Sequence, residues 1–292
     1  MTSSWSGQGL PPIAQARMAE IKASGTWSSA LTTDEFASIK SAGFDPVGQV
    51  LGAAVYNIGY RGGYGCPSYA TFGTYNRMSS GWMGYQPSIT AVSSSGSGTA
   101  YGPLVRTLYA ARRSAIARMT AECASLGGHG VVGVSLTIGR FPAGGLEFKA
   151  IGTAVRAPGA MPLRRPFTSD LSGQDFWTLI RAGYAPLSMV MGSCVYHIAH
   201  QRIGGKIGNI GRNVELEQFT QALYDARELA MSRMQAEAEE LHAEGIVGVQ
   251  LRQHSHTWGS HTTEFFAIGT AVRPLREDHV IERPTMVLSL DG

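Results

Sequence analysis

The feature that most constrains the fold of this chain is a tandem repeat. The segment FASIKSAGFDPVGQVLGAAVYNI, which begins at Phe36, aligns with FWTLIRAGYAPLSMVMGSCVYHI, which begins at Phe176. A second pair of blocks, LYAARRSAIARM and LYDARELAMSRM, begins at Leu108 and Leu223, and EFKAIGTAVR and EFFAIGTAVR follow later in each copy. Because three blocks recur in the same order, the chain contains two copies of one structural unit.

Each copy predicts the same succession of elements. In the first copy, Thr32 and Glu35 are spaced as a capping box, which predicts a short helix that Gly43 ends. A Val- and Met-rich run at 47–58, and its counterpart at 187–198, predicts a buried strand. A long amphipathic helix and two further strands, VVGVSL or IVGVQL and then AIGTAV, complete the unit. We therefore expect an α+β fold with an antiparallel three-stranded sheet and one long helix in each copy.

The long helix of the second copy shows its periodicity clearly. Apolar residues recur at steps of three, four or seven, which places them on one helical face. These residues are Leu216, Phe219, Leu223, Ala230, Met234 and Leu241. Gly130 and Gly245 lie just past the two helix ends. Glycines inside the strands, at Gly52, Gly152, Gly192 and Gly269, indicate bulges or close backbone contacts. One helix over three strands leaves open edges and uncovered sheet surface, so the sequence predicts self-association.

The repeat also divides the chain. We expect an N-terminal extension at 1–30, a first domain at 31–160 that carries an insertion at 59–102, a second domain at 161–274, and a tail at 275–292. A net charge of +3 with 15% charged residues gives no general attraction to nucleic acid or to an acidic membrane. Three widely spaced cysteines without a C-x-x-C pattern indicate reduced thiols, and no signal peptide or membrane span is recognisable, which favours a cytoplasmic protein.

These motifs resemble those of a known family. The pattern A-R-x-x-A-x-x-R-M-x-x-E occurs from Ala111 to Glu122 and from Ala226 to Glu237, and G-x-V-G-V and A-x-G-T-A-V follow it in both copies. The chain thereby resembles the YbjQ family, whose members carry a heavy-metal-binding label. The resemblance implies β-α-β-β units similar to the dodecin subunit, which assemble into pentameric rings, and it supplies no ligand motif.

Two repeats in one chain constrain such a ring by parity. A single ring of five domains cannot be built from whole chains that each contribute two. We expect a homopentamer in which ten domains form two stacked rings, and a ring of six domains from three chains is the alternative.

Histidines provide the candidate metal ligands. His254, His256 and His261 lie in RQHSHTWGSH, where strand alternation and a hairpin could bring imidazoles to one zinc, nickel or copper ion. His197 and His200 form a second candidate pair after the first strand of copy two. The first copy has IGRFPAGG where the hairpin lies, and a polar hairpin tip is the alternative interpretation.

The insertion at 59–102 provides a candidate surface for a protein partner. Aromatic residues stand there among glycines, and exposed aromatic residues are typical of contact surfaces. They include Tyr64, Tyr69, Phe72, Tyr75, Trp82 and Tyr85. Arg61 and Arg77 are too few for a phosphate track, so nucleic-acid binding is not expected.

Charged residues on the long helices have a structural interpretation. Arg118 and Glu122, four residues apart and repeated in the second copy, are spaced as surface ion pairs. The recurrent Arg112 and Arg227 could instead meet a neighbouring subunit, and Glu147 and Glu264 could be buried acids in a subunit interface. The sequence contains no G-x-S-x-G, P-loop, H-E-x-x-H or dinucleotide motif.

The sequence therefore predicts a non-enzymatic, oligomeric protein that binds a divalent or heavy metal. Two other functions stay open: a symmetric scaffold that presents the insertion to a protein partner without metal, and a small-ligand store in clefts between subunits.

Overall fold

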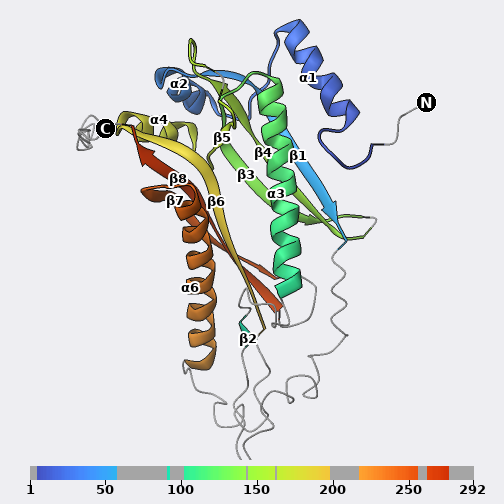
Figure 1. The fold of residues 1–292 in the computed structure, drawn as a ribbon, viewed down its shortest axis with the longest axis vertical. Helices are drawn as coiled ribbons and strands as arrows, with labels where there is room; N and C mark the ends of the chain where they lie inside the picture. The colour runs from blue at the N-terminus through green and yellow to red at the C-terminus, as the bar shows by residue number, and fades with distance from the viewer. Residues whose placement is uncertain are drawn as a thin grey trace, which may run out of the picture.

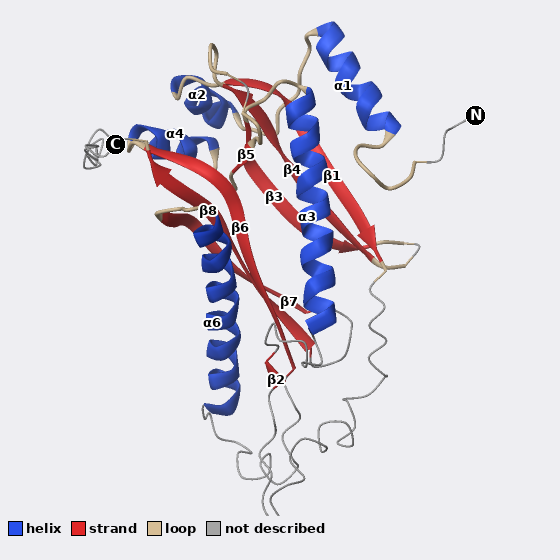
Figure 2. Cartoon of the chain, in the orientation of Figure 1, coloured by secondary structure: helices blue, strands red, loops and turns tan. Residues whose placement is uncertain are grey.

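A computed structural model describes residues 5–57, 91–92, 102–142, 144–161, 163–197, 217–255 and 262–275. Two similar units lie side by side, each with a long helix against a sheet (Figures 1 and 2). The architecture is α+β, with two tandem β-α-β-β units, as the repeat predicts.

The first repeat contains α2 (Thr33–Ser41), β1 (Asp45–Tyr56), α3 (Gly102–Ser125), β3 (Gly130–Arg140) and β4 (Leu146–Arg156), and helix α1 (Pro12–Ser24) precedes it. The second repeat contains α4 (Gly173–Arg181), β6 (Tyr184–His197), α6 (Glu217–Glu240), β7 (Gly245–Ser255) and β8 (Thr262–Pro274). Two short strands, β2 (Ala91–Val92) and β5 (Phe167–Thr168), lie between these elements in the chain.

Among the described residues each sheet has four strands, where the sequence predicted three. The strand orders are β1-β4-β3-β5 and β2-β6-β8-β7, and the three long strands of each sheet are antiparallel. The fourth strand comes from the other half of the chain: β5, which leads into repeat 2, pairs in parallel with β3 of repeat 1. In the same way β2, within the insertion of repeat 1, pairs with β6 of repeat 2. This exchange ties the two repeats together.

The helix boundaries confirm the capping prediction and correct the helix ends. Thr32 and Glu35 form the complete capping box, and Ser172 caps α4. The turns after the long helices pass through Gly127 and His242, both in the left-handed region. Gly130 and Gly245, which were expected at those turns, begin β3 and β7 instead, because the backbone reverses a few residues earlier.

The long helices lie directly on glycines of the first strands. A Cβ at Gly52 would meet the Ala115 carbonyl oxygen of α3, and a Cβ at Gly192 would meet the Ala230 carbonyl oxygen of α6. Of the two interpretations, bulges or close backbone contacts, the second therefore holds for Gly52 and Gly192, and these contacts fix the height of each helix above its sheet.

The main hydrophobic core extends across both repeats. It joins residues of α3, β1, β3 and β4 to Met189, Met191, Val195, Phe266 and Ile268 of the second sheet. The opposite face of the second sheet packs on α6 through a separate cluster that includes Cys194, Ala230 and Met234. Repeat 1 therefore covers the sheet face of repeat 2 that α6 leaves open.

The predicted α6 face is buried only in part among the residues whose side chains the structure describes. Ala230 and Met234 lie in the core and Leu241 is partly buried, whereas Leu223 is 39% exposed. No helix in the described ranges is both long and apolar enough to cross a membrane.

Candidate functional site: the polar junction between the repeats

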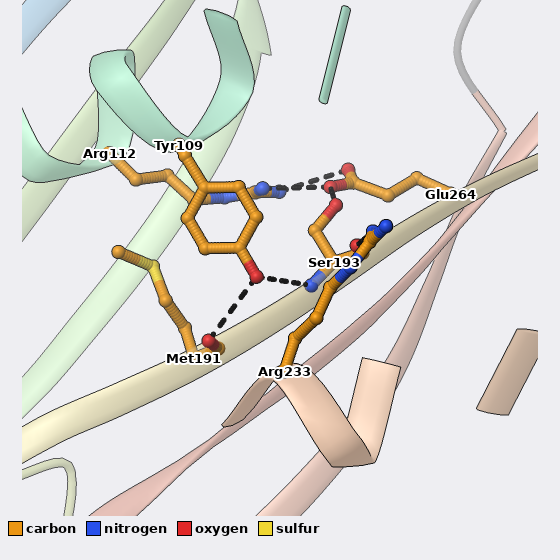
Figure 3. A network of polar contacts seen from close by, with 6 residues as sticks. All are labelled: Tyr109, Arg112, Met191, Ser193, Arg233 and Glu264. Carbon is orange, nitrogen blue, oxygen red and sulfur yellow. Dashed lines mark hydrogen bonds and ion pairs between the residues drawn. The ribbon is translucent and has the colours of Figure 1, made fainter. Parts of the chain in front are cut away.

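A buried ion pair joins the two repeats at their centre (Figure 3). Arg112 extends from α3, Glu264 extends from β8, and neither side chain is exposed to solvent. The guanidinium donates from Nη1 to Oε1 at 2.7 Å and from Nη2 to Oε2 at 2.9 Å. Such a two-bond pair fixes both the distance and the orientation of α3 relative to the second sheet. Glu264, expected as a buried acid in a subunit interface, is thus buried between the two repeats of one chain, whereas Glu147, of which the same was expected, has a side chain that is 28% exposed.

Ser193 and Tyr109 complete the junction. The Ser193 hydroxyl donates to Oε1 of Glu264 at 2.5 Å, and the Ser193 N–H donates to the Tyr109 hydroxyl at 2.9 Å. The Tyr109 hydroxyl in turn donates to the Met191 carbonyl at 3.4 Å, and Arg233 donates to the Ser193 carbonyl. Burial raises the pKa of Tyr109 to about 12, so the phenol is neutral at ordinary pH. These bonds satisfy the outer edge of β6.

Aromatic rings surround the guanidinium of Arg112. Its Cζ lies 4.0 Å from the Phe266 ring centroid and 6.0 Å from that of Phe148. A cation over an aromatic face in a desolvated site is favourable, and the rings also exclude water from the ion pair. The junction therefore combines a charged pair with apolar packing from both repeats.

The junction is built for packing and not for reaction. Both Glu264 oxygens are engaged, the Ser193 hydroxyl points at a carboxylate that Arg112 neutralises, and all three side chains are buried. A nucleophile or acid-base pair needs access to substrate and a base free to take a proton, and this network offers neither.

Polar side chains on the helices also serve the strand edges. Arg118 and Glu122 were expected to form a surface ion pair, but Glu122 is buried and accepts the Leu51 N–H at 2.8 Å. Arg118 donates to the Ala53 carbonyl at 2.5 Å. In repeat 2, Glu237 accepts the Met191 N–H at 2.9 Å. Burial raises the pKa of Glu122, while the Leu51 N–H and Arg17 lower it.

Two open cavities lie between α3 and α6. They measure about 490 and 410 Å³, and the Arg113–Glu237 bridge, at 2.7 Å, borders both. The larger reaches β6 at Met189 and Met191, and the smaller lies at Tyr109 and Arg233. Their size would admit a small ligand, but their mouths are wide.

Two of the predicted metal ligands, His197 and His254, lie at one end of the second sheet. His254 lies in β7, opposite Glu264 in the register, with its ring 6.4 Å from that of Phe266. His197 ends β6, where it pairs with Thr262. His200, His256 and His261 lie outside the described residues. Within the described residues, no three His, Cys, Asp or Glu side chains are grouped as a metal site, and Arg112 already holds Glu264.

The predicted partner surface lies outside the described residues. This applies to Tyr64, Tyr69, Phe72, Tyr75, Trp82 and Tyr85. The described part of the insertion before α3 is β2, in which Ala91 pairs with His197 and Val92 with Tyr196. The described cysteines, Cys123 and Cys194, are buried and form no disulfide, and burial raises the pKa of Cys123 to about 12.

Tyr109 and Ser193 were not predicted as members of the junction. Tyr109 recurs as Tyr224, so the repeat itself carried a signal for the phenol. Ser193 aligns with Ala53 of repeat 1. A hydroxyl at this position in repeat 2 alone was a signal that the strand contacts a polar side chain there.

Comparison with known proteins assigns the family. The model of the YbjQ family, described as "Putative heavy-metal-binding", matches residues 87–158 and 185–274. The chain belongs to the YbjQ family.

Relatives of two lengths accompany this assignment. The YbjQ chain is 42% identical to the encapsulin nanocompartment protein Rv1762c of Mycobacterium tuberculosis, over 97% of this chain and 98% of the relative. A UPF0145 protein of Helicobacter hepaticus is 38% identical over 33% of this chain and 91% of its own length. A UPF0145 protein of Thermus thermophilus is 37% identical over 31% of this chain and 80% of its own. The short relatives match about one repeat, consistent with tandem copies, and none of these names is that of an enzyme.

Proposed function

We propose that this YbjQ-family chain is a non-enzymatic, oligomeric component of a protein nanocompartment. The observation that carries the proposal is the junction, in which Arg112 of the family pattern and Glu264, which recurs as Glu147 just before A-x-G-T-A-V, pack one domain on another. The nanocompartment relative matches over nearly the whole of both chains, so it shares the tandem arrangement and not merely one domain.

Sedimentation of native particles tests this proposal. The chain is produced at its natural level in its own host, and the lysate is separated on a sucrose gradient with mass-spectrometric quantification. We expect the chain in the fast fractions that contain nanocompartment-sized particles, well ahead of a host protein with the same mass as the free oligomer. A chain found wholly in slow fractions contradicts the proposal.

Metal binding is the second candidate function. It is supported by the description of the family and by the histidine-rich end of the second sheet, where His197 and His254 pair with Thr262 and Glu264 of the same strand. Because Glu264 is held by Arg112, ligands would have to come from histidines, with His256, His261 and His200 as further members. Imidazole ligands suit zinc, nickel and copper.

Elemental analysis of untagged protein tests this candidate. About one zinc, nickel or copper per chain is expected for a three-histidine site. Replacing His254, His256 and His261 together by Ala should remove the metal, whereas His242→Asn, which suits the left-handed backbone at that turn, should not. Protein that lacks metal and takes up none from solution would remove this candidate and leave the nanocompartment proposal unaffected.

A further inference from the structure

The two repeats present the same surfaces, but each surface is covered in one repeat and open in the other. In repeat 1, Leu108 and Leu136 are 0% and 5% exposed beneath repeat 2, whereas the aligned Leu223 and Leu251 are 39% and 45% exposed. On the opposite side, Met191 and Val195 of repeat 2 are 4% and 0% exposed against repeat 1, whereas the aligned Leu51 and Val55 are 39% and 47% exposed. The chain therefore ends in two open surfaces that match the two halves of its own internal interface.

The residues of the buried ion pair are likewise covered in one repeat and open in the other. Arg112 and Glu264 are buried together, and their aligned residues are Arg227 and Glu147. Arg227 lies partly exposed on α6 beside Glu228, and Glu147 lies on β4, 3.3 Å from Lys149. An arginine and an acid that form a pair between the repeats thus recur at the two open surfaces.

The edge strand β7 of repeat 2 lacks the added strand that its counterpart β3 has in repeat 1. The segment that leads into repeat 2 adds to β3: the Ser169 N–H donates to the Val131 carbonyl at 2.9 Å, and the Val134 N–H donates to the Ser169 carbonyl at 3.0 Å. The aligned strand β7 is the edge of its sheet among the described strands. The aligned leading segment, residues 27–31 with sequence WSSAL, matches FTSDL at 167–171.

A glycine marks where the leading segment docks. A Cβ at Gly130 would meet the Phe167 ring, so Gly130 makes room for that ring. The aligned Gly245 has no atom within 4 Å of the same position. Trp27 aligns with Phe167, and it stacks on Phe36 at 5.8 Å as Phe167 stacks on Phe176. The space beside Gly245 therefore matches an aromatic ring that the same chain carries at its other end.

We propose that the open surface of repeat 2 binds repeat 1 of a second copy of this chain by repeating the internal interface. Arg227 pairs with Glu147 of the second copy, Tyr224 approaches the outer edge of its β1, and its residues 27–31 extend the sheet beyond β7. The proposal rests on the oligomeric assembly proposed above and names the surfaces that form it. Backbone pairing along an edge strand supplies affinity, and the flanking side chains supply register.

The contact is head-to-tail, so successive copies form a ring or a filament. Because each chain contributes two repeats that already pack side by side, a closed ring contains an even number of domains. This favours the six-domain ring of three chains over the two stacked rings of five, since stacking would place the two repeats of one chain in different rings.

Three differences make the contact between chains weaker than the internal one. Lys149 occupies the position that aligns with Phe266, whose ring covers Arg112. The pair between Arg227 and Glu147 therefore has more polar surroundings than the internal pair. Glu228 stands where Arg113 reaches Glu237, so that bridge does not recur. Helix α1 also lies beside the outer edge of β1, where Arg17 donates to the Gln49 carbonyl at 3.0 Å. It occupies part of the surface that the second copy would contact, but it leaves Leu51 and Val55 exposed.

A charge exchange tests the proposal. Mass by light scattering is measured for the wild-type chain, for Glu147→Arg, for Arg227→Glu and for the double variant. We expect the wild type at about three times the 31.1 kDa chain mass, each single variant at one chain mass, and the double variant restored, because its reversed pair forms at every contact. Glu239→Arg is the matched control: the aligned Ala124 is exposed beside the internal interface, so position 239 lies outside the proposed contact.

Amide hydrogen exchange provides an independent readout. The amides of Gly248 and Val249 should exchange slowly in the assembled wild type and quickly in Glu147→Arg. A monomeric wild type overturns the proposal. It does so even if a variant without residues 1–25 associates, because α1 would then cover the outer edge of β1 in the natural chain. Single variants that keep the wild-type mass also overturn it. An assembly that obeys the charge exchange but never sediments with nanocompartment particles supports this contact and contradicts only the nanocompartment proposal.

Discussion

At the scale of residues, the junction shows why aligned side chains differ in role. Arg112 and Arg227 occupy the same position of the same motif, yet one is buried against an acid and the other lies at the surface. The difference arises from what each repeat meets inside the chain and not from the local sequence. Energetic effects at these residues should therefore differ between repeats.

Arg112→Met should be strongly destabilising. The substitution leaves Glu264 buried without its cation, which costs about 3–5 kcal/mol of the free energy of unfolding. The double variant Arg112→Met/Glu264→Leu should recover most of this loss, because no buried charge remains. Urea unfolding of the wild type, both single variants and the double variant measures the cycle. A double variant as unstable as Arg112→Met would show that the charge is not the cause.

Alkaline pH should destabilise the wild type through Tyr109. Its pKa is about 12 in the folded chain against 10.0 for the ordinary side chain, so between these values the unfolded state loses the proton first. Stability attributable to the neutral phenol is complete below pH 10 and falls as pH rises towards 12, by about 2–3 kcal/mol for two pKa units. Tyr109→Phe should lack this fall, although it loses the Ser193 bond at every pH. Urea unfolding from pH 8 to 12 measures both, and parallel curves would contradict the assignment.

At the scale of elements, the long helices are held close to their sheets by glycine. Gly192→Ala introduces a methyl group towards the Ala230 carbonyl oxygen, and the Met234 nitrogen is only 2.9 Å from the same position. Overpacking of this kind costs about 1–3 kcal/mol, and we expect the full amount because backbone atoms cannot move aside alone. Gly139→Ala in β3 is the control, since nothing lies within 4 Å of its added methyl group. Equal unfolding midpoints for the two variants would refute this account of the helix height.

The elements themselves could be read from the sequence because their signals are local. Capping residues, apolar periodicity and recurrent blocks placed α2, α3, α6 and the long strands. The short strands β2 and β5 could not be predicted, because each depends on a distant partner strand and two residues carry no periodicity. The junction was predicted only as recurrent charges. Arg112 could have paired with either copy's acid, and only the packing of the repeats decides that it meets Glu264.

For the whole molecule, duplication of the domain buries one pair of complementary apolar surfaces and leaves the other pair exposed. Inside the chain, repeat 1 covers the apolar face of repeat 2, and the aligned surfaces at the two ends stay uncovered. The tandem chain thus joins two of these complementary surfaces covalently and leaves the other two open. The linked contact also differs in sequence from the open surfaces, since Phe266 lies at the position aligned with Lys149.

This arrangement predicts that unfolding depends on chain concentration. Association of folded chains draws the equilibrium away from the unfolded state, so the urea midpoint of the wild type should rise as the chain is concentrated. Glu147→Arg, which lacks the contact between chains but keeps the internal junction, should show a midpoint independent of concentration. Added salt should lower the wild-type midpoint at low chain concentration, since the polar pair of Arg227 and Glu147 beside Lys149 is screened more readily than a buried one. A concentration-independent wild type would mean that the open surfaces of the two repeats do not meet in solution.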